Sequence, residues 1–167
     1  MGHKDPPKWR AAERLLDEFS ICEHWMTTKV RTVAPTDSIE HTRACLKRYR
    51  INQMPVVARG KLLGIVTDRD IRSSLGLRGK AAASQRRVRS VMSRPAIALG
   101  CHSTLLNAAD VMRQSRIGAV PIVRGETLVG IVTRSDILDA FVGFANGRYY
   151  RKAPRHSSPR KSGRSRG

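Results

Sequence analysis

Two threonine–aspartate pairs have the residue types and the spacing to bind a polar ligand. Thr67 and Asp70 close the run Gly-Ile-Val-Thr-Asp-Arg-Asp, and Thr133 and Asp136 close the run Gly-Ile-Val-Thr-Arg-Ser-Asp. An aspartate carboxylate can accept hydrogen bonds from two neighbouring hydroxyl groups of a sugar, and a helix N-terminus beside it favours a phosphate. The Thr-x-x-Asp spacing also caps a helix without any ligand, so the motif supports both interpretations.

The two motifs lie in an internal repeat whose copies are 66 residues apart. The same offset relates Met26 to Met92 and Pro55 to Pro121, so the copies align without a gap. In each copy, β-rich runs and amphipathic stretches follow one another in the order strand, helix, strand, strand, helix. We therefore predict an α/β (α+β) fold built from two β-α-β-β-α units.

Turn and capping residues set the boundaries of these elements. Asp37 is expected to cap the first helix, with Glu40 as its capping-box partner, and Ser103 or Thr104 is expected to open the corresponding helix of the second copy. Helices over 70–75 and 135–144 follow the two motifs. The expected strands cover residues 30–33, 55–57, 62–67, 96–99, 121–123 and 128–133.

Outside the repeats, the chain contains one helical pattern and two basic stretches. Trp9, Ala12, Leu16 and Phe19 recur at helical spacing, which predicts an amphipathic helix up to about residue 23. The basic tail over 148–167 lacks the apolar residues whose burial would offset the entropy lost on ordering the chain, so we expect it to be disordered. The predicted segments are a lead and helix over 1–24, the first repeat over 25–75, a basic linker over 76–90, the second repeat over 91–147 and a basic tail over 148–167.

This arrangement resembles the CBS domain, named after cystathionine β-synthase, in two tandem copies that form a Bateman module. The resemblance covers residues 25–141 and rests on Met at the start, Pro before the hairpin and Gly-x-x-Thr-x-x-Asp at the end of each copy. It implies two copies packed with pseudo-twofold symmetry around clefts that bind AMP, ADP, ATP or S-adenosylmethionine. It also implies a homodimer that acts as a sensor and transmits ligand occupancy to a partner.

The resemblance also implies which residues contact the ligand. The motif positions that match ribose-contacting residues are Thr67, Asp70, Thr133 and Asp136. Arg69 and Arg134, inside the two motifs, are within reach of phosphate groups.

The adenine side of each cleft is expected to combine the first strand of a repeat with the residues before its hairpin proline. Residues 29–31 would then face 52–54, and 95–97 would face 118–120. The two halves differ here, so we do not expect equal affinities. The residues assigned to this side are Val30, Asn52, Met54, Ile97, Ala119 and Val120.

The net charge of +19 indicates anionic partners. No acidic residue occurs between 71 and 109 or from 148 onward. An alternative function is therefore association with nucleic acid through the basic linker and tail, with affinity that falls as salt rises. A second alternative is a dimeric module that docks on an acidic protein, and a tail that only increases solubility remains open as well.

Several classes of protein are not supported by the sequence. No apolar run approaches the ~20 residues that span a bilayer, and the first residues lack the apolar core of a signal peptide, so we expect a cytoplasmic protein without a membrane segment. The three cysteines are far apart, and the five histidines show no metal-ligand spacing. His102 follows Cys101, but a surface turn explains that pair. We therefore predict no metal and no catalytic activity.

Overall fold

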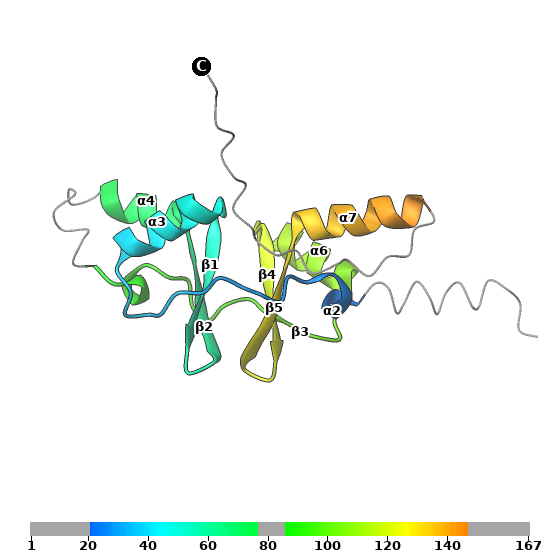
Figure 1. Ribbon diagram of the computed structural model, residues 1–167, viewed down its shortest axis with the longest axis horizontal. Coiled ribbons are helices and arrows are strands. Elements are labelled where there is room, and N and C mark those ends of the chain that lie inside the picture. The colour runs from blue at the N-terminus through cyan, green and yellow to red at the C-terminus, as the bar shows by residue number, and fades with distance from the viewer. Residues whose placement is uncertain (1–20, 77–85, 147–167) are drawn as a thin grey trace, which may run out of the picture.

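Two β-hairpins lie next to each other at the centre of the molecule, and a pair of helices covers each one (Figure 1). The fold is a computed structural model, and residues 21–76 and 86–146 are described. The predicted disorder of the tail lies outside the described residues, as do the part of the predicted amphipathic helix up to residue 20 and residues 77–85 of the linker predicted over 76–90.

The strands form one sheet in the order β1-β2-β5-β4-β3. Both hairpins are antiparallel, and their registers are related by the offset of 66 residues. A β-bulge occurs between Val56 and Val57 in one hairpin and between Ile122 and Val123 in the other. The strands are β1 (Gln53–Ala58), β2 (Lys61–Thr67), β3 (Leu99–Gly100), β4 (Ala119–Arg124) and β5 (Thr127–Thr133).

The helices begin at polar capping residues. Thr104 caps its helix as predicted, but Ser38 rather than Asp37 caps the corresponding helix of the first repeat. The carboxylate of Asp37 is already used, because its Oδ2 accepts a hydrogen bond from the Ala34 N–H at 2.8 Å. The helical elements are α2 (Cys22–Trp25), α3 (Ile39–Tyr49), α4 (Asp68–Gly76), the 3₁₀ turn η1 (Val88–Ser90), α6 (Leu105–Gln114) and α7 (Arg134–Ala145). None of the helices within the described ranges has the length and apolar character needed to cross a membrane.

The first strand of each predicted unit is much shorter than expected. Residues 96–99 contribute only the start of β3, and residues 30–33 contribute a single bridge between Val33 and Val56. The physical reason lies upstream, because Thr27 is already hydrogen-bonded to Ile131 in the other hairpin. The chain must cross between the halves after Thr27, and it reaches β1 only at Val33.

Each repeat begins with a segment that packs first in the opposite half of the molecule and then returns to its own hairpin. We call residues 21–33 and 87–99 the lead segments. Cys22 and Trp25 of the first lead segment are buried in the core of the second repeat. Val88 of the second lead segment is fully buried in the core of the first repeat. Burying an apolar side chain of this size contributes about 1.5–3 kcal/mol, so the exchange joins the two halves strongly.

Backbone hydrogen bonds hold each lead segment against a strand of the other repeat, at equivalent positions in the two halves. The backbone N–H groups of Thr27 and Ile131 donate to each other's carbonyls, at 2.9 and 3.1 Å. Ser93 and Ile65 exchange the same pair of bonds at 2.9 and 3.0 Å. The two lead segments therefore run along β5 and β2, and each brings its residues to the end of the strand that carries a Thr-x-x-Asp motif.

Candidate functional site

The first Thr-x-x-Asp motif joins β2 to α4. Oδ2 of Asp70 accepts hydrogen bonds from the Thr67 backbone N–H at 2.9 Å and from the Thr67 hydroxyl at 2.7 Å. The Thr67 hydroxyl in turn accepts a hydrogen bond from the Asp70 N–H at 3.1 Å. The motif is thus a capping box, and within the described residues no donor reaches Oδ1 of Asp70.

The second motif makes the same bonds at the start of α7. Thr133 is the N-cap, and its N–H and hydroxyl both donate to Oδ2 of Asp136 at 2.7 Å. The two carboxylates differ in exposure, because Asp136 is only 3% exposed whereas Asp70 is half-buried. The capping interpretation therefore applies to both motifs, while only the Asp70 carboxylate is available at a surface.

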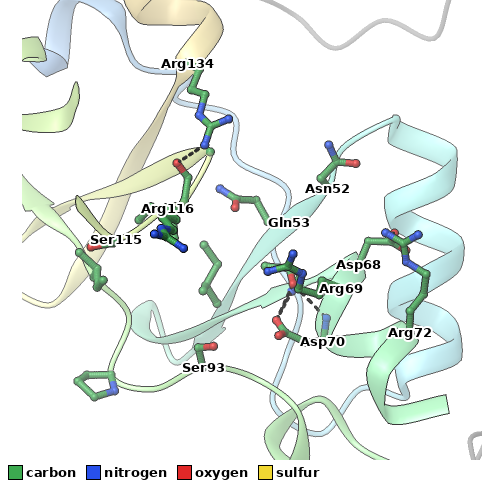
Figure 2. A pocket seen from close by; sticks show the side chains of 16 residues that line it. Asn52, Gln53, Asp68, Arg69, Asp70, Arg72, Ser93, Ser115, Arg116 and Arg134 are labelled. Atoms are coloured by element: carbon green, nitrogen blue, oxygen red, sulfur yellow. Dashed lines mark hydrogen bonds and ion pairs between the residues drawn. The ribbon is translucent and has the colours of Figure 1, made fainter. Parts of the chain in front are cut away.

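A cleft of about 730 Å³ opens at the first motif (Figure 2). The first repeat contributes its hairpin and the start of α4, and the second repeat contributes the lead segment, the loop after α6 and the start of α7. The cleft therefore lies between the repeats. Its lining residues are Asn52, Gln53, Ile65, Thr67, Asp68, Arg69, Asp70, Arg72, Ser93, Pro95, Ile97, Ser115, Arg116, Ile117, Gly118 and Arg134.

Half of the predicted site residues line this cleft, namely Asn52, Thr67, Arg69, Asp70, Ile97 and Arg134. Met54, Ala119 and Val120 are core residues, at most 3% exposed, because their strand faces point into the packed interior. Val30, Thr133 and Asp136 are also not among the residues that line it.

The cleft combines segments that were predicted to lie on two separate adenine sides. Pro95 and Ile97 share it with Gly118, from the segment paired with them in the prediction, and also with Asn52 and Gln53 of the first repeat. The exchange of lead segments explains this, because Ser93 is bonded to Ile65 on β2.

The charged groups of the cleft carry an excess of positive charge. Four arginines and two aspartates line it. Arg72 pairs with Asp68 at 2.6 Å, and Arg134 donates to the Ile117 carbonyl at 3.1 Å. In the described part of the chain, Arg69 and Arg116 have no acidic partner, so they are the cations most available to an anionic ligand.

Arg116 was not predicted from the sequence, and Gln53 was predicted only as part of the segment 52–54, not as an assigned site residue. Figure 2 shows Gln53 between the Asp70 side of the cleft and Arg116. The Nε2 of Gln53 is buried and has no hydrogen-bond partner within the described residues, which is costly unless a ligand accepts the bond. Arg116 adopts a left-handed conformation (φ 54°), as does its repeat counterpart Arg50 (φ 53°). The shared Arg-Ile pair after each helix was visible in the repeat and could have drawn attention to Arg116.

Comparisons with known proteins agree with this architecture. A family model for the CBS domain matches residues 21–76 and 88–143. The chain is 36% identical over 119 residues to the CBS domain-containing protein YhcV of Bacillus subtilis, covering 71% of this chain and 84% of that protein. It is 32% identical over 117 residues to inosine-5'-monophosphate dehydrogenase of Korarchaeum cryptofilum, covering 69% of this chain but only 23% of the enzyme.

A solved structure has the same fold. The CBS domain pair of protein MJ0100, in complex with 5'-methylthioadenosine and S-adenosyl-L-methionine, aligns with a TM-score of 0.65 and 28% identity over 74% of this chain and 97% of that chain. CBS pair proteins are regulatory modules. The chain belongs to the CBS-domain family and carries two CBS domains in tandem.

Proposed function

We propose that this chain is a regulatory sensor that binds an adenosine-containing ligand in the cleft at Asp70. The proposal rests on the Asp70 carboxylate, of which only one oxygen is hydrogen-bonded within the described residues. Oδ2 of Asp70 is engaged by Thr67, whereas Oδ1 remains available within a cleft that also holds Arg69 and Arg116. A ribose diol at the carboxylate and a phosphate at the arginines would satisfy all three groups.

The balance of charge favours one class of adenosine compound. The MJ0100 pair binds 5'-methylthioadenosine and S-adenosyl-L-methionine, so an adenosine group suits this fold. Here the cleft has two more arginines than aspartates, and a phosphate is attracted to guanidinium groups by charge-assisted, often bidentate, hydrogen bonds. AMP, ADP or ATP should therefore bind more tightly than S-adenosylmethionine, whose sulfonium group is cationic.

The proposed output follows from the position of the cleft between the repeats. A ligand that contacts Asp70 on one repeat and Arg116 on the other binds best when both are correctly spaced. It can shift the packing of the two repeats only by the difference in its affinity for the two arrangements. A partner that contacts both repeats would sense that shift.

A homodimer is part of the proposal, and the exposed face of α6 and α7 supports it. Leu138 and Phe141 are 63% and 68% exposed, and Leu106 is 71% exposed. The positions equivalent to Leu106 and Leu138 in the first repeat carry the charged residues Glu40 and Arg72, whereas Phe141 corresponds to Leu75, so this face is more apolar in the second repeat. A second copy of the chain would cover it by a self-complementary contact.

Isothermal titration calorimetry of the full chain with AMP, ATP, 5'-methylthioadenosine and S-adenosylmethionine tests the ligand. We expect Asp70→Asn to weaken nucleotide binding by about tenfold or more, because a charge-assisted hydrogen bond is worth about 1.5–3 kcal/mol. Asp110→Asn, on the exposed face of α6, is the matched control and should bind as the wild type does. Absence of binding to every adenosine compound, or unchanged affinity in Asp70→Asn, would contradict the proposal.

A further inference from the structure

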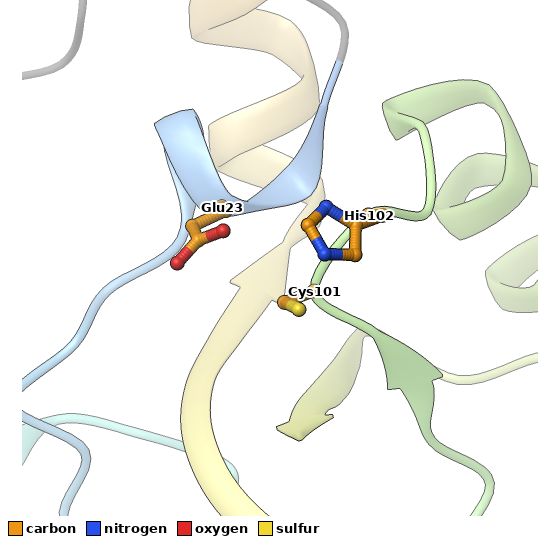
Figure 3. Close-up of side chains that lie close together, drawn as sticks. All are labelled: Glu23, Cys101 and His102. Atoms are coloured by element: carbon orange, nitrogen blue, oxygen red, sulfur yellow. The ribbon is translucent and has the colours of Figure 1, made fainter. Parts of the chain in front are cut away.

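A second group of polar side chains converges outside the cleft, and none of its residues lines the cleft. Glu23 lies on α2, and Cys101 and His102 lie in the turn after β3 (Figure 3). One donor atom from each of the three side chains lies within 4.8 Å of the other two. The group thus offers a carboxylate oxygen, a thiol sulfur and an imidazole nitrogen close to one another.

The backbone holds α2 firmly over that turn. The Cys22 N–H donates to the Ser103 carbonyl at 2.8 Å, and the Cys22 thiol donates to the Thr104 carbonyl at 3.2 Å. The turn itself is fixed to β4, because the Cys101 N–H donates to the Val123 carbonyl at 3.2 Å. Glu23 is therefore positioned by the fold rather than by a flexible loop.

We propose that Glu23, Cys101 and His102 form a binding site for Zn²⁺. Zinc prefers nitrogen and sulfur donors, accepts a carboxylate as well, and is tetrahedral, so three protein ligands leave one position for a water molecule. Mg²⁺ and Ca²⁺ require oxygen donors, and a thiolate with an imidazole excludes them. Cys101 is 5% exposed and His102 is exposed, so the site has a dry side and an open side.

Arg124 is a basic side chain that interacts with this group. Its guanidinium pairs with Glu23 at 2.9 Å. The pKa of Arg124 is raised, first by a hydrogen bond and charge interaction with Cys101 and then by the charge of Glu23. The side chain of Arg124 is 66% exposed, so it can turn into solvent at small cost when a metal ion binds.

The other two described cysteines do not fit a metal site. Burial raises the pKa of the Cys22 thiol to about 11, so it stays protonated at neutral pH and keeps its bond to Thr104. Cys45 lies 3.5 Å from Nε2 of His41, but this pair on α3 has only two donors. The His41–Cys45 pair therefore serves as a natural control.

The proposed metal would fasten one repeat to the other. Glu23 belongs to the lead segment of the first repeat, and Cys101 and His102 belong to the second repeat. Zinc binding should therefore stabilise the docking of α2 against the second repeat, without occupying the cleft at Asp70.

The test is titration of the metal-free full chain with Zn²⁺ by calorimetry, together with Co²⁺ absorption spectroscopy to detect a thiolate–metal charge-transfer band. We expect about one ion per chain and a loss of affinity of about 100-fold or more in Glu23→Gln, His102→Ala and Cys101→Ser, with loss of the band in Cys101→Ser. Arg124→Gln should bind about tenfold more tightly, because no ion pair has to be broken.

The controls separate a folding defect and a competing site from the proposal. Glu23→Gln and His102→Ala alter residues outside the core, and far-ultraviolet circular dichroism without metal checks that they fold. The double variant His41→Ala, Cys45→Ser should bind zinc as the wild type does. Absence of saturable binding in the wild type, or binding that is lost in the double variant but kept in His102→Ala, would overturn the proposal.

Discussion

The carbonyl oxygen of Ser93 lies where a side chain on Gly64 would begin, 2.6 Å from the position of a Cβ atom built on that glycine. The same relationship recurs in the second repeat, where a Cβ on Gly130 would lie 2.6 Å from Cγ of Met26. In both places, a lead segment crosses from one repeat and packs directly on the strand of the other. The glycine of each motif is thus required by the exchange of lead segments.

Gly64→Ala should therefore lower the free energy of unfolding, by about 1–3 kcal/mol as for other overpacked cores. Gly130→Ala should cost less, because its closest neighbour is the flexible Met26 side chain whereas Gly64 faces backbone. Urea denaturation measures both. Gly100→Ala, which has no atom within 4 Å of the added Cβ, is the control. Equal stability of Gly64→Ala and Gly100→Ala would show that the Ser93 contact is wrong.

The two motif aspartates should respond differently to substitution. Asp136 is buried and completes the capping box of α7, so Asp136→Ala is expected to lower the free energy of unfolding by about 1–3 kcal/mol. Nucleotide affinity, measured at a temperature where the variant is folded, should change little. Thermal denaturation and calorimetry on the same samples separate the effects, and a large loss of affinity with normal stability would place a ligand at Asp136 instead.

Substitution of Gln53 should raise stability but weaken nucleotide binding, the opposite of what we expect for Asp136. Gln53→Met removes a buried donor that has no partner among the described residues, so stability should rise by about 1 kcal/mol. Nucleotide affinity should fall, because the cleft loses a hydrogen-bond donor. Gln114→Met, on the exposed end of α6, is the matched control. A variant that binds normally would exclude Gln53 from the ligand contacts.

Acid should weaken the junction between the two hairpin turns. Lys61 and Glu126 form an exposed ion pair between the two hairpin turns. Their hydrogen bond, and then their charge attraction, lower the pKa of Glu126 and raise the pKa of Lys61. The pKa of Glu126 is lower in the folded state than in the unfolded state, where it is about 4.3. The ion pair therefore stabilises the protein fully at pH values above the unfolded-state pKa. This contribution is lost as the pH falls through the folded-state pKa.

Nuclear magnetic resonance titration of the Glu126 carboxyl carbon measures this directly. In Lys61→Met, the pKa should move back up toward the ordinary value of a glutamate, and high salt should reduce the difference from the wild type. Lys47→Met, on the exposed face of α3, should leave the titration unchanged. A Glu126 pKa that is the same with and without Lys61 would contradict the ion pair.

The exposed face of α6 and α7 predicts the oligomeric state. Phe141→Asp should convert a dimer into a monomer in analytical ultracentrifugation, because a charge would be buried at the contact. Leu63→Asp changes a side chain on β2 that is 38% exposed and should leave the dimer intact. Dissociation by the β2 variant alone would place the interface elsewhere.

The sequence by itself determined the repeat, the order of the elements and the strand-to-helix junctions that contain Thr67 and Thr133. These follow from local rules, because apolar periodicity, turn residues and capping residues act over a few positions. The equal offset between the copies required no tertiary information, and it correctly predicted two similar hairpins and their following helices.

Only the tertiary structure decided which segments meet. The crossing of the lead segments brings Ile97 to Asn52 and Glu23 to Cys101, and no local pattern reports contacts between residues so far apart. Identical motifs therefore acquire different surroundings, with Asp70 open to a cleft and Asp136 buried. Burial depends on what the rest of the chain packs against a residue, and that is a property of the whole fold.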